Sequence, residues 1–412
     1  MNKPFAHFIL TIALGAGLTF IPVLAQTPDG ALVVPDNTFM ILDPVGKSLD
    51  IDGDNVYNFT SVSIGQNSTL RLKASKMRKN AGVVFVVSGD VTIGFAGSIN
   101  INGDDGDVLV QPGQLSRRPS DPGPGGYPGG VGSRTDTAAS AAGDGFGPAG
   151  SRGIAETIGC ATVVTTNASN NHMNLSMIPL VGGAGGAGGY CASFPFGGNG
   201  GAGGGALRIV AAGTISMANS ATITANGGAG SGINGNGPAA GRGSGGMIHL
   251  IAPTITFGLN NKLSAETTGT SEQVPLKNGA GVIRLNATTV NGLAQVQTLP
   301  TAIQGPLYSI PLPSGIPEVV ISKVDGLNVA VPPSGLITGA DVVINNPNPV
   351  QVLLNAKNIP VGTAVTLRLN SENVADQTVT CPGLTGTLAA STTTCTATFP
   401  LGANLSVASL SW

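Results

Sequence analysis

Short runs of alternating apolar and polar residues recur along much of the chain. Four segments align with one another, each with a short strand, a corner of small residues and a second short strand: residues 83–93, 206–216, 247–257 and 282–292. The first three continue into a third alternating strand, at residues 98–103, 222–227 and 262–266. A period of two places every second side chain on the same face of a strand. The pattern therefore predicts a repeated unit of three strands.

One such unit cannot bury its apolar face alone, so the units are expected to stack on one another. Stacking in register makes three parallel sheets around a core of Val, Ile, Leu and Ala side chains. Residues 62–74 match the second and third strands of the unit, which therefore recurs about five times, complete or partial. Asn102 and Asn226 fall at equivalent corners, where asparagine tolerates a left-handed backbone. The predicted fold class is all-β, a short parallel β-helix.

Glycine-rich stretches interrupt this repeat. Residues 103–205 contain almost no strand pattern, and residues 227–246 separate two further units. We interpret both stretches as long excursions from corners of the coil stack. Two structures are compatible with their composition. They are flexible loops, or extended polyproline-II-like segments that pack closely because glycine has no side chain.

The pattern changes after about residue 300. Closely spaced prolines break any regular element there and predict a linker over residues 301–317. About seven short strands follow, among them residues 341–344, 350–354, 364–369, 377–381, 395–399 and 405–410. Their spacing is typical of an immunoglobulin-like β-sandwich. The predicted domains are thus a β-helix over residues 26–300, with an insertion at about 103–205, and a sandwich over residues 318–412.

Composition agrees with a β fold. Charged residues make up 10% of the chain and aromatic residues 4%, whereas glycine alone supplies 63 positions. A helical protein would carry more Glu, Lys and Arg. The mean hydropathy is +0.26 and the net charge is −2, and disordered chains combine low hydropathy with high net charge. We therefore expect most of the chain to fold.

The N-terminus has the three regions of a signal peptide. Asn2 and Lys3 precede an apolar run over residues 8–24, and small residues, Val23 and Ala25, precede Gln26. Removal of residues 1–25 predicts a secreted, cell-surface or periplasmic protein with no membrane span after cleavage. The mature chain has a net charge of −3, because Lys3 is the only charged residue lost. A nearly neutral surface gives no reason to expect a nucleic-acid partner.

The four cysteines lie in the exported part and form two local pairs. We expect disulfides between Cys160 and Cys191 and between Cys381 and Cys395. The second bridge is predicted to close two neighbouring strands rather than to join two sheets. Neither pair has the C-x-x-C spacing that zinc sites favour.

Residues 205–216 and 220–228 resemble coils of the filamentous-haemagglutinin and autotransporter type of bacterial surface protein. The resemblance covers residues 56–300 without the insertion. It implies a right-handed parallel β-helix and an adhesion function. The Asn-Pro-Asn secretion motif of the haemagglutinins is missing from the mature N-terminus. The pattern also resembles the pectin-lyase fold, which implies a polysaccharide-active enzyme as the alternative.

Two groups of acidic residues are candidates for metal binding. Asp50, Asp52 and Asp54, with a glycine turn between them, match part of a calcium loop. The competing interpretation is a turn before the first coil. The second group, Asp104, Asp105 and Asp107, is interpreted as a solvated turn, with a carboxylate pair or a calcium site as the alternative. Calcium is thus the only cofactor that the sequence suggests.

Two further groups are candidates for binding. Arg208, His249 and Arg284 occupy equivalent outward positions and predict a stacked column, either ordinary solvated surface or a weak site for anionic sugar. Three aromatic residues lie beside Cys191 in the glycine-rich insertion, and either stack on glycans or partners or anchor the insertion to the coils. They are Tyr190, Phe194 and Phe196.

No residue is assigned a catalytic role, because no set of catalytic residue types is visible in the repeats. We therefore expect a non-catalytic structural or adhesion protein, with an extracellular glycan or a surface protein as its partner. The alternative is a lyase or hydrolase of the pectin-lyase-like fold, whose carboxylates would be Asp104, Asp105 or Asp107.

Overall fold

The computed structural model is all-β over the residues that it describes, namely 29–44, 49, 55–107, 119–132, 145–147, 150, 168, 173–189, 198–231, 240–267, 279–307, 318–329, 340–345, 348–371, 377–400 and 406–412. Helical structure in these residues is limited to two short 3-10 segments, η1 (Ala74–Lys76) and η3 (Leu293–Gln295). The all-β class is confirmed, and so are the parallel sheets.

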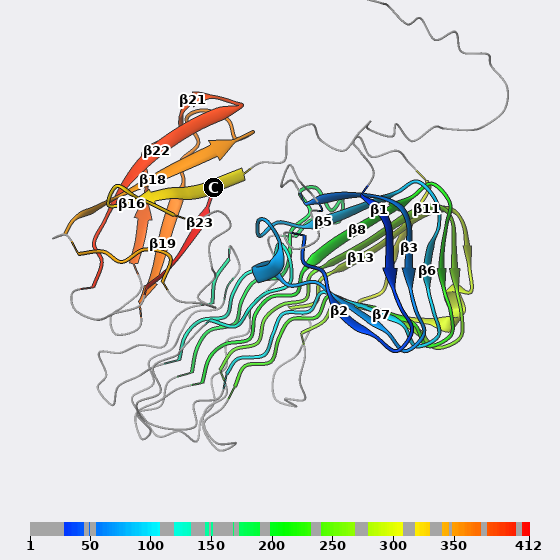
Figure 1. Ribbon diagram of the computed structural model, residues 1–412. Coiled ribbons are helices and arrows are strands. Elements are labelled where there is room, and N and C mark those ends of the chain that lie inside the picture. Colours follow the sequence, from blue (N-terminus) through cyan, green and yellow to red (C-terminus); the bar gives the residue numbers. More distant parts are fainter. Residues whose placement is uncertain are drawn as a thin grey trace, which may run out of the picture.

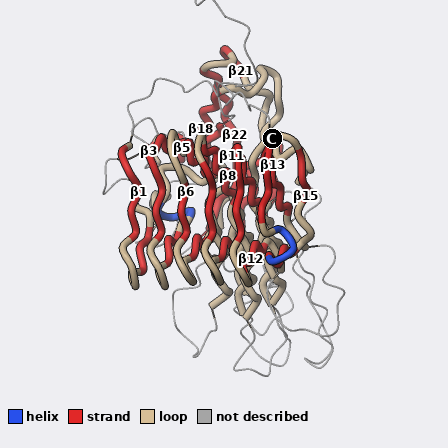
Figure 2. The backbone as a smooth tube through the Cα atoms, turned by 90° about the vertical axis from the view of Figure 1, so that its right-hand side faces the viewer, coloured by secondary structure: helices blue, strands red, loops and turns tan. Residues whose placement is uncertain are grey.

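Two parallel sheets form the N-terminal stack of coils (Figures 1 and 2). The nine-stranded sheet contains β1 (Gly30–Val34), β3 (Val56–Ile64), β5 (Val83–Val87), β6 (Val91–Ile93), β8 (Ala206–Ala211), β9 (Thr214–Met217), β11 (Met247–Phe257), β13 (Val282–Asn291) and β15 (Ile303–Gly305). The six-stranded sheet contains β2 (Phe39–Ile41), β4 (Thr69–Arg71), β7 (Ser98–Asn100), β10 (Thr222–Thr224), β12 (Asn261–Ser264) and β14 (Val296–Leu299).

The nine-stranded sheet covers two sides of each coil. Long strands such as β11 bend, so that residues 247–251 pair with β8 and residues 254–257 pair with β9. The six-stranded sheet forms the third side. The three-strand unit read from the sequence is therefore one coil, and successive coils pair in register.

The core lies inside the coils. On the six-stranded sheet, neighbouring strands place Leu70 beside Ile99, Ile99 beside Ile223, and Ile223 beside Leu263. All four side chains are fully buried in one apolar cluster with residues of the other sheet. Each contributes about 1.5–3 kcal/mol relative to an exposed side chain. The alternation in the sequence directly produces these ladders.

One corner of every coil has a left-handed residue. The positive-φ positions between the nine-stranded and six-stranded sheets are Asn37, Asn67, Ala96, Ser220, Asn260 and Gly292. The prediction that Asn102 and Asn226 serve this purpose is wrong, because neither has a positive φ. Their role is to accept hydrogen bonds: Asn102 Oδ1 accepts from Asn226 N at 2.7 Å, and Asn226 Oδ1 accepts from Glu266 N at 2.8 Å.

The glycine-rich excursions pack as extended segments beside one another (Figure 1). We call residues 101–107, 119–132, 181–189, 198–205, 226–231 and 240–246 the glycine lattice. Along residues 200–205, successive backbone N–H groups point in turn to three different neighbouring segments. The donor–acceptor pairs are Gly200–Gly130, Gly203–Tyr127, Gly201–Gly241, Gly204–Ser244, Ala202–Asp104 and Gly205–Ile101, at 2.7–3.0 Å. Every third residue thus reaches the same neighbour, as in a helix of polyproline-II type with three residues per turn.

Glycine is required in the lattice because neighbouring backbones touch. A Cβ atom on Gly203 would lie 1.8 Å from the carbonyl oxygen of Gly183, and one on Gly185 would lie 1.8 Å from that of Pro128. Between the two structures that composition left open, packed extended segments are therefore the one found in the described residues. The described residues of the insertion form a packed layer attached to the coils.

The coil stack is longer at both ends than the repeats predicted. Strands β1 and β2 form a coil that the alignment missed, and β15 pairs with β13 at Arg284, Leu285 and Asn286. Residues 303–305 therefore belong to the stack, and the prediction of a linker there is wrong. Residues 308–317 lie outside the described part.

The C-terminal region contains two antiparallel sheets around a separate apolar cluster. The five-stranded sheet comprises β16 (Glu318–Val324), β17 (Leu327–Asn328), β18 (Val350–Lys357), β21 (Thr385–Thr387) and β22 (Ala390–Ala397). The three-stranded sheet comprises β19 (Thr366–Ser371), β20 (Gln377–Thr380) and β23 (Ser406–Ser411). Residues 341–344 are not a strand, contrary to the prediction.

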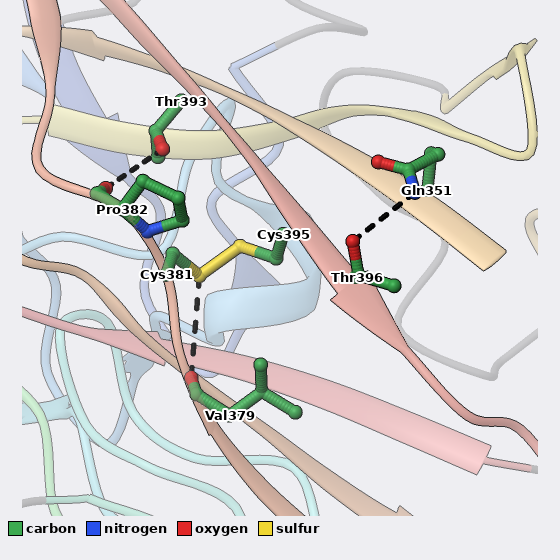
Figure 3. The surroundings of a disulfide bond; sticks show 7 residues. All are labelled: Gln351, Val379, Cys381, Pro382, Thr393, Cys395 and Thr396. Atoms are coloured by element: carbon green, nitrogen blue, oxygen red, sulfur yellow. Dashed lines mark hydrogen bonds between the residues drawn. A yellow bond between two sulfur atoms is a disulfide. The ribbon is translucent and has the colours of Figure 1, made fainter. Parts of the chain in front are cut away.

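The Cys381–Cys395 disulfide is confirmed, but its placement differs from the prediction (Figure 3). Cys395 lies on β22 of the five-stranded sheet, whereas Cys381 directly follows β20 of the three-stranded sheet. The bridge therefore joins the two sheets. The predicted closure of two neighbouring strands is wrong, because spacing in the sequence does not reveal which sheet each strand enters.

Arg368 on β19 also donates a hydrogen bond to the Gly145 carbonyl at 3.1 Å.

Candidate functional site

Charged side chains meet where the six-stranded sheet passes into the glycine lattice. Asp104 Oδ1 accepts from Arg71 Nη2 at 2.8 Å, and Asp104 Oδ2 accepts from Lys73 Nζ at 2.5 Å. Arg71 lies at the end of β4, and its side chain is 7% exposed. Because both carboxylate oxygens are bound, Asp104 fastens the lattice to the adjacent coil.

A second carboxylate lies beside this ion pair. Asp121, in the lattice, accepts a hydrogen bond from the Ser75 hydroxyl. Burial raises the pKa of Asp121, and the negative charge of Asp104 raises it further, against the opposing effects of Ser75 and Lys73. Asp121 could not be found from the sequence, because nothing in the residues around it indicates that it approaches residues 71–75.

Within the acidic group Asp104, Asp105 and Asp107, the side chains of Asp104 and Asp105 diverge. Asp105 Oδ1 accepts from Ala229 N at 2.7 Å, in the direction of the next lattice segment, while Asp104 is directed to Arg71. The backbone carbonyl of Asp107 accepts from the Ser231 hydroxyl at 2.7 Å. In an extended helix with three residues per turn, successive side chains point in different directions, so the carboxylates of Asp104 and Asp105 move apart. In the described residues, no group of three or more His, Cys, Asp or Glu side chains could hold a metal ion.

A shallow groove of about 500 Å³ opens at this junction. Its lining residues are Arg71, Asn100, Asn102, Gly103, Asp104, Asp105, Gly227 and Ala229. Five of these eight residues have polar or charged side chains. Asn100 and Asn102 were not expected at the groove, although Asn102 recurs as Asn226 at the end of an aligned strand, a signal that could have indicated its importance.

The column of Arg208, His249 and Arg284 is present. The register of β8, β11 and β13 places His249 beside both arginines. The structure differs from the expected solvated surface, because His249 is fully buried and Arg208 is 4% exposed.

Residues 173–181 cover this column. Arg208 Nη2 donates to the Met177 carbonyl and Arg284 Nη1 donates to the Leu175 carbonyl, both at 2.7 Å. The Met177 side chain is fully buried and packs in a small cluster with Met247. The column therefore holds a covering segment on the sheet, which sequence alignment of the repeats alone could not show.

Burial also sets the charge of the histidine. The pKa of His249 is lowered to about 3, chiefly by desolvation and also by the positive charges of Arg208 and Arg284, whereas the hydrogen bond with Asn286 acts in the opposite direction. His249 is thus neutral at physiological pH.

Several predicted residues lie outside the described part of the chain. These are the calcium candidates Asp50, Asp52 and Asp54, the aromatic residues Tyr190, Phe194 and Phe196, and the cysteines Cys160 and Cys191. Their predicted roles stay predictions.

The chain matches no protein-family model, no curated protein and no solved structure. Within the described ranges, no helix has the length and apolar character needed to cross a membrane.

Proposed function

We propose that this chain is a secreted or cell-surface protein with a non-catalytic structural or adhesive function. In this proposal the coil stack is a right-handed parallel β-helix and the C-terminal sheets form an immunoglobulin-like sandwich. The Cys381–Cys395 bridge supports an oxidising location, because disulfides persist outside the reducing cytosol. The partner would be an extracellular glycan or a surface protein.

One observation carries the proposal: the charged side chains at the junction are used to hold the scaffold together. Both oxygens of Asp104 bind Arg71 and Lys73, and Asp105 binds the backbone of Ala229. A general acid or base must have a free oxygen within reach of its substrate and a partner group opposite it. Asp104 has no free oxygen, and Asp105, whose Oδ2 remains available, diverges from it, so this pair suits a scaffold better than catalysis.

A second candidate function is a polysaccharide lyase or hydrolase. The groove favours it, because Arg71, Asp104 and Asp105 all line an open surface beside the coils. In such an enzyme Asp105, which is exposed, would be the acid or base.

Incubation of the purified mature protein with pectin, alginate and other plant and microbial glycans separates the two functions. If the function is structural or adhesive, no new reducing ends or unsaturated products should form. Beads coated with the protein should be retained on one of these glycans or on a cell surface. Turnover that disappears in Asp104→Asn or Asp105→Asn would contradict it.

A further inference from the structure

We propose that the junction groove binds a neutral sugar unit of an extended glycan through Asn100, Asn102 and Asp105. The inference rests on the adhesive function proposed above and specifies its site and its ligand class. All three residues line the groove, which lies between β7 and the first lattice segments.

Two of these side chains are held by one atom and leave the other available. Asn102 Oδ1 accepts from Asn226 N, and Asp105 Oδ1 accepts from Ala229 N, each at 2.7 Å. The structure gives Asn102 Nδ2 and Asp105 Oδ2 no partner among the described residues. The orientation of each group is thus fixed before a ligand arrives, which reduces the entropy lost on binding.

Asn100 is held in the same way. Its Oδ1 accepts from Arg71 Nη1 at 2.7 Å and from Asn102 N at 3.0 Å. Its Nδ2 likewise has no partner in the described part of the chain. The groove therefore presents amide donors from two asparagines and a carboxylate acceptor from Asp105. Sugar hydroxyls both donate and accept, so they satisfy such a set.

The charges at the site favour a neutral ligand. Arg71 and Lys73 carry two positive charges and Asp104 and Asp105 two negative ones, so the site has no net charge, and Asp105 Oδ2 is the carboxylate oxygen that remains available. This carboxylate repels uronic acids and other anions. A metal ion is disfavoured, because the amide N–H groups of Asn100 and Asn102 would face it.

The size and shape of the groove favour a chain over a small free molecule. Its volume of about 500 Å³ is within the range of ligand sites, but the surface is shallow and does not enclose a ligand. A glycan that continues past both ends of the groove can lie on such a surface.

The test is titration of the full mature protein with four neutral tetrasaccharides, cellotetraose, maltotetraose, xylotetraose and tetra-N-acetylchitotetraose, and with tetragalacturonate. We expect saturable binding of at least one neutral tetrasaccharide by calorimetry, and weaker binding of tetragalacturonate. Asn102→Asp and Asp105→Asn keep the Oδ1 atoms that bind the backbone. The first replaces the amide donor that faces the ligand by a carboxylate oxygen, and the second replaces the carboxylate oxygen by an amide donor. Each should weaken binding about tenfold or more, which is about 1.4 kcal/mol.

Asn226→Asp is the matched control. Asn226 Oδ1 also accepts a backbone N–H, from Glu266, but the residue does not line the groove. This variant should bind like the wild type, and circular dichroism should show that all three variants fold. The proposal is overturned if no neutral tetrasaccharide binds, or if the folded groove variants bind as well as the wild type. If beads coated with those variants still adhere to glycan, the adhesive function stands without this site, whereas glycan turnover would contradict the adhesive function itself.

Discussion

Arg208 and His249 lie side by side on neighbouring parallel strands, and Arg208 Nε donates a hydrogen bond to His249 Nδ1 at 3.2 Å. Because a guanidinium cannot accept, Nδ1 carries no proton, and His249 Nε2 donates to Asn286 Oδ1 at 2.9 Å. Protonation of the ring would place two N–H groups against each other inside the protein. The neutral histidine is therefore part of what holds residues 173–181 on the sheet.

This arrangement predicts acid sensitivity. The pKa of His249 falls to about 3 in the folded chain, from the ordinary value of 6.5. Between these values the unfolded chain binds more protons, so the free energy of unfolding should fall as the pH falls, by roughly 1.4 kcal/mol per pH unit from this group. Urea unfolding at a series of pH values measures the slope. His249→Gln should lower the stability at pH 7 and remove part of the slope below pH 6.5; equal slopes in both proteins would contradict the prediction.

The glycine lattice predicts a strong effect of a single methyl group. Gly203→Ala places a Cβ atom 1.8 Å from the Gly183 carbonyl oxygen, so two segments must separate. We expect a loss of about 3 kcal/mol or more in the free energy of unfolding. The control is Ala202→Gly at the neighbouring position, which should cost about 1 kcal/mol or less. Similar melting temperatures for the two variants would show that the lattice tolerates side chains.

The left-handed corner predicts a stabilising substitution. Ala96 has a φ of 51°, whereas Asn37, Asn67 and Asn260 occupy the equivalent corners. Alanine is strained there by about 1–2 kcal/mol, and asparagine tolerates the conformation. Ala96→Asn should therefore raise the free energy of unfolding by about 0.5–1 kcal/mol. Thermal unfolding of the variant and the wild type measures this gain. Ala212→Asn, at an exposed position with an ordinary backbone, should give no gain in the same experiment.

The disulfide predicts a local effect. Cys381 and Cys395 are separated by 14 residues and belong to the C-terminal apolar cluster, which shares no residue with the cluster inside the coils. Replacement of both by alanine should destabilise the C-terminal sheets by about 3 kcal/mol. Calorimetry should show a lower transition for these sheets and an unchanged transition for the coils. A shift of both transitions together would mean that the two cores unfold as one unit.

The repeats show how much local pattern can decide. Alternation at positions such as Ile99, Ile223 and Leu263 predicted the inward face of each strand and the parallel stacking of the coils, because a strand with period two has only one apolar face to bury. The same reasoning missed β1 and β2, which add a coil before the aligned repeats.

The candidate site could be predicted only in part. Equivalent positions in aligned repeats correctly brought Arg208, His249 and Arg284 together, since in-register stacking makes such residues neighbours. That residues 173–181 would cover them could not be predicted, because that contact joins distant parts of the chain. Asp121 was missed for the same reason.

By itself, the sequence determined the strands of the aligned repeats, their inward faces and the repeated coil, because these depend on residues close together in the chain. It also supplied the glycines without which the lattice could not form. Only the tertiary structure decided that the described residues of the insertion pack as a lattice, that the Cys381–Cys395 bridge joins two sheets and that Asp104 and Asp105 diverge. Each of these depends on which distant segments meet, and composition and spacing do not specify that.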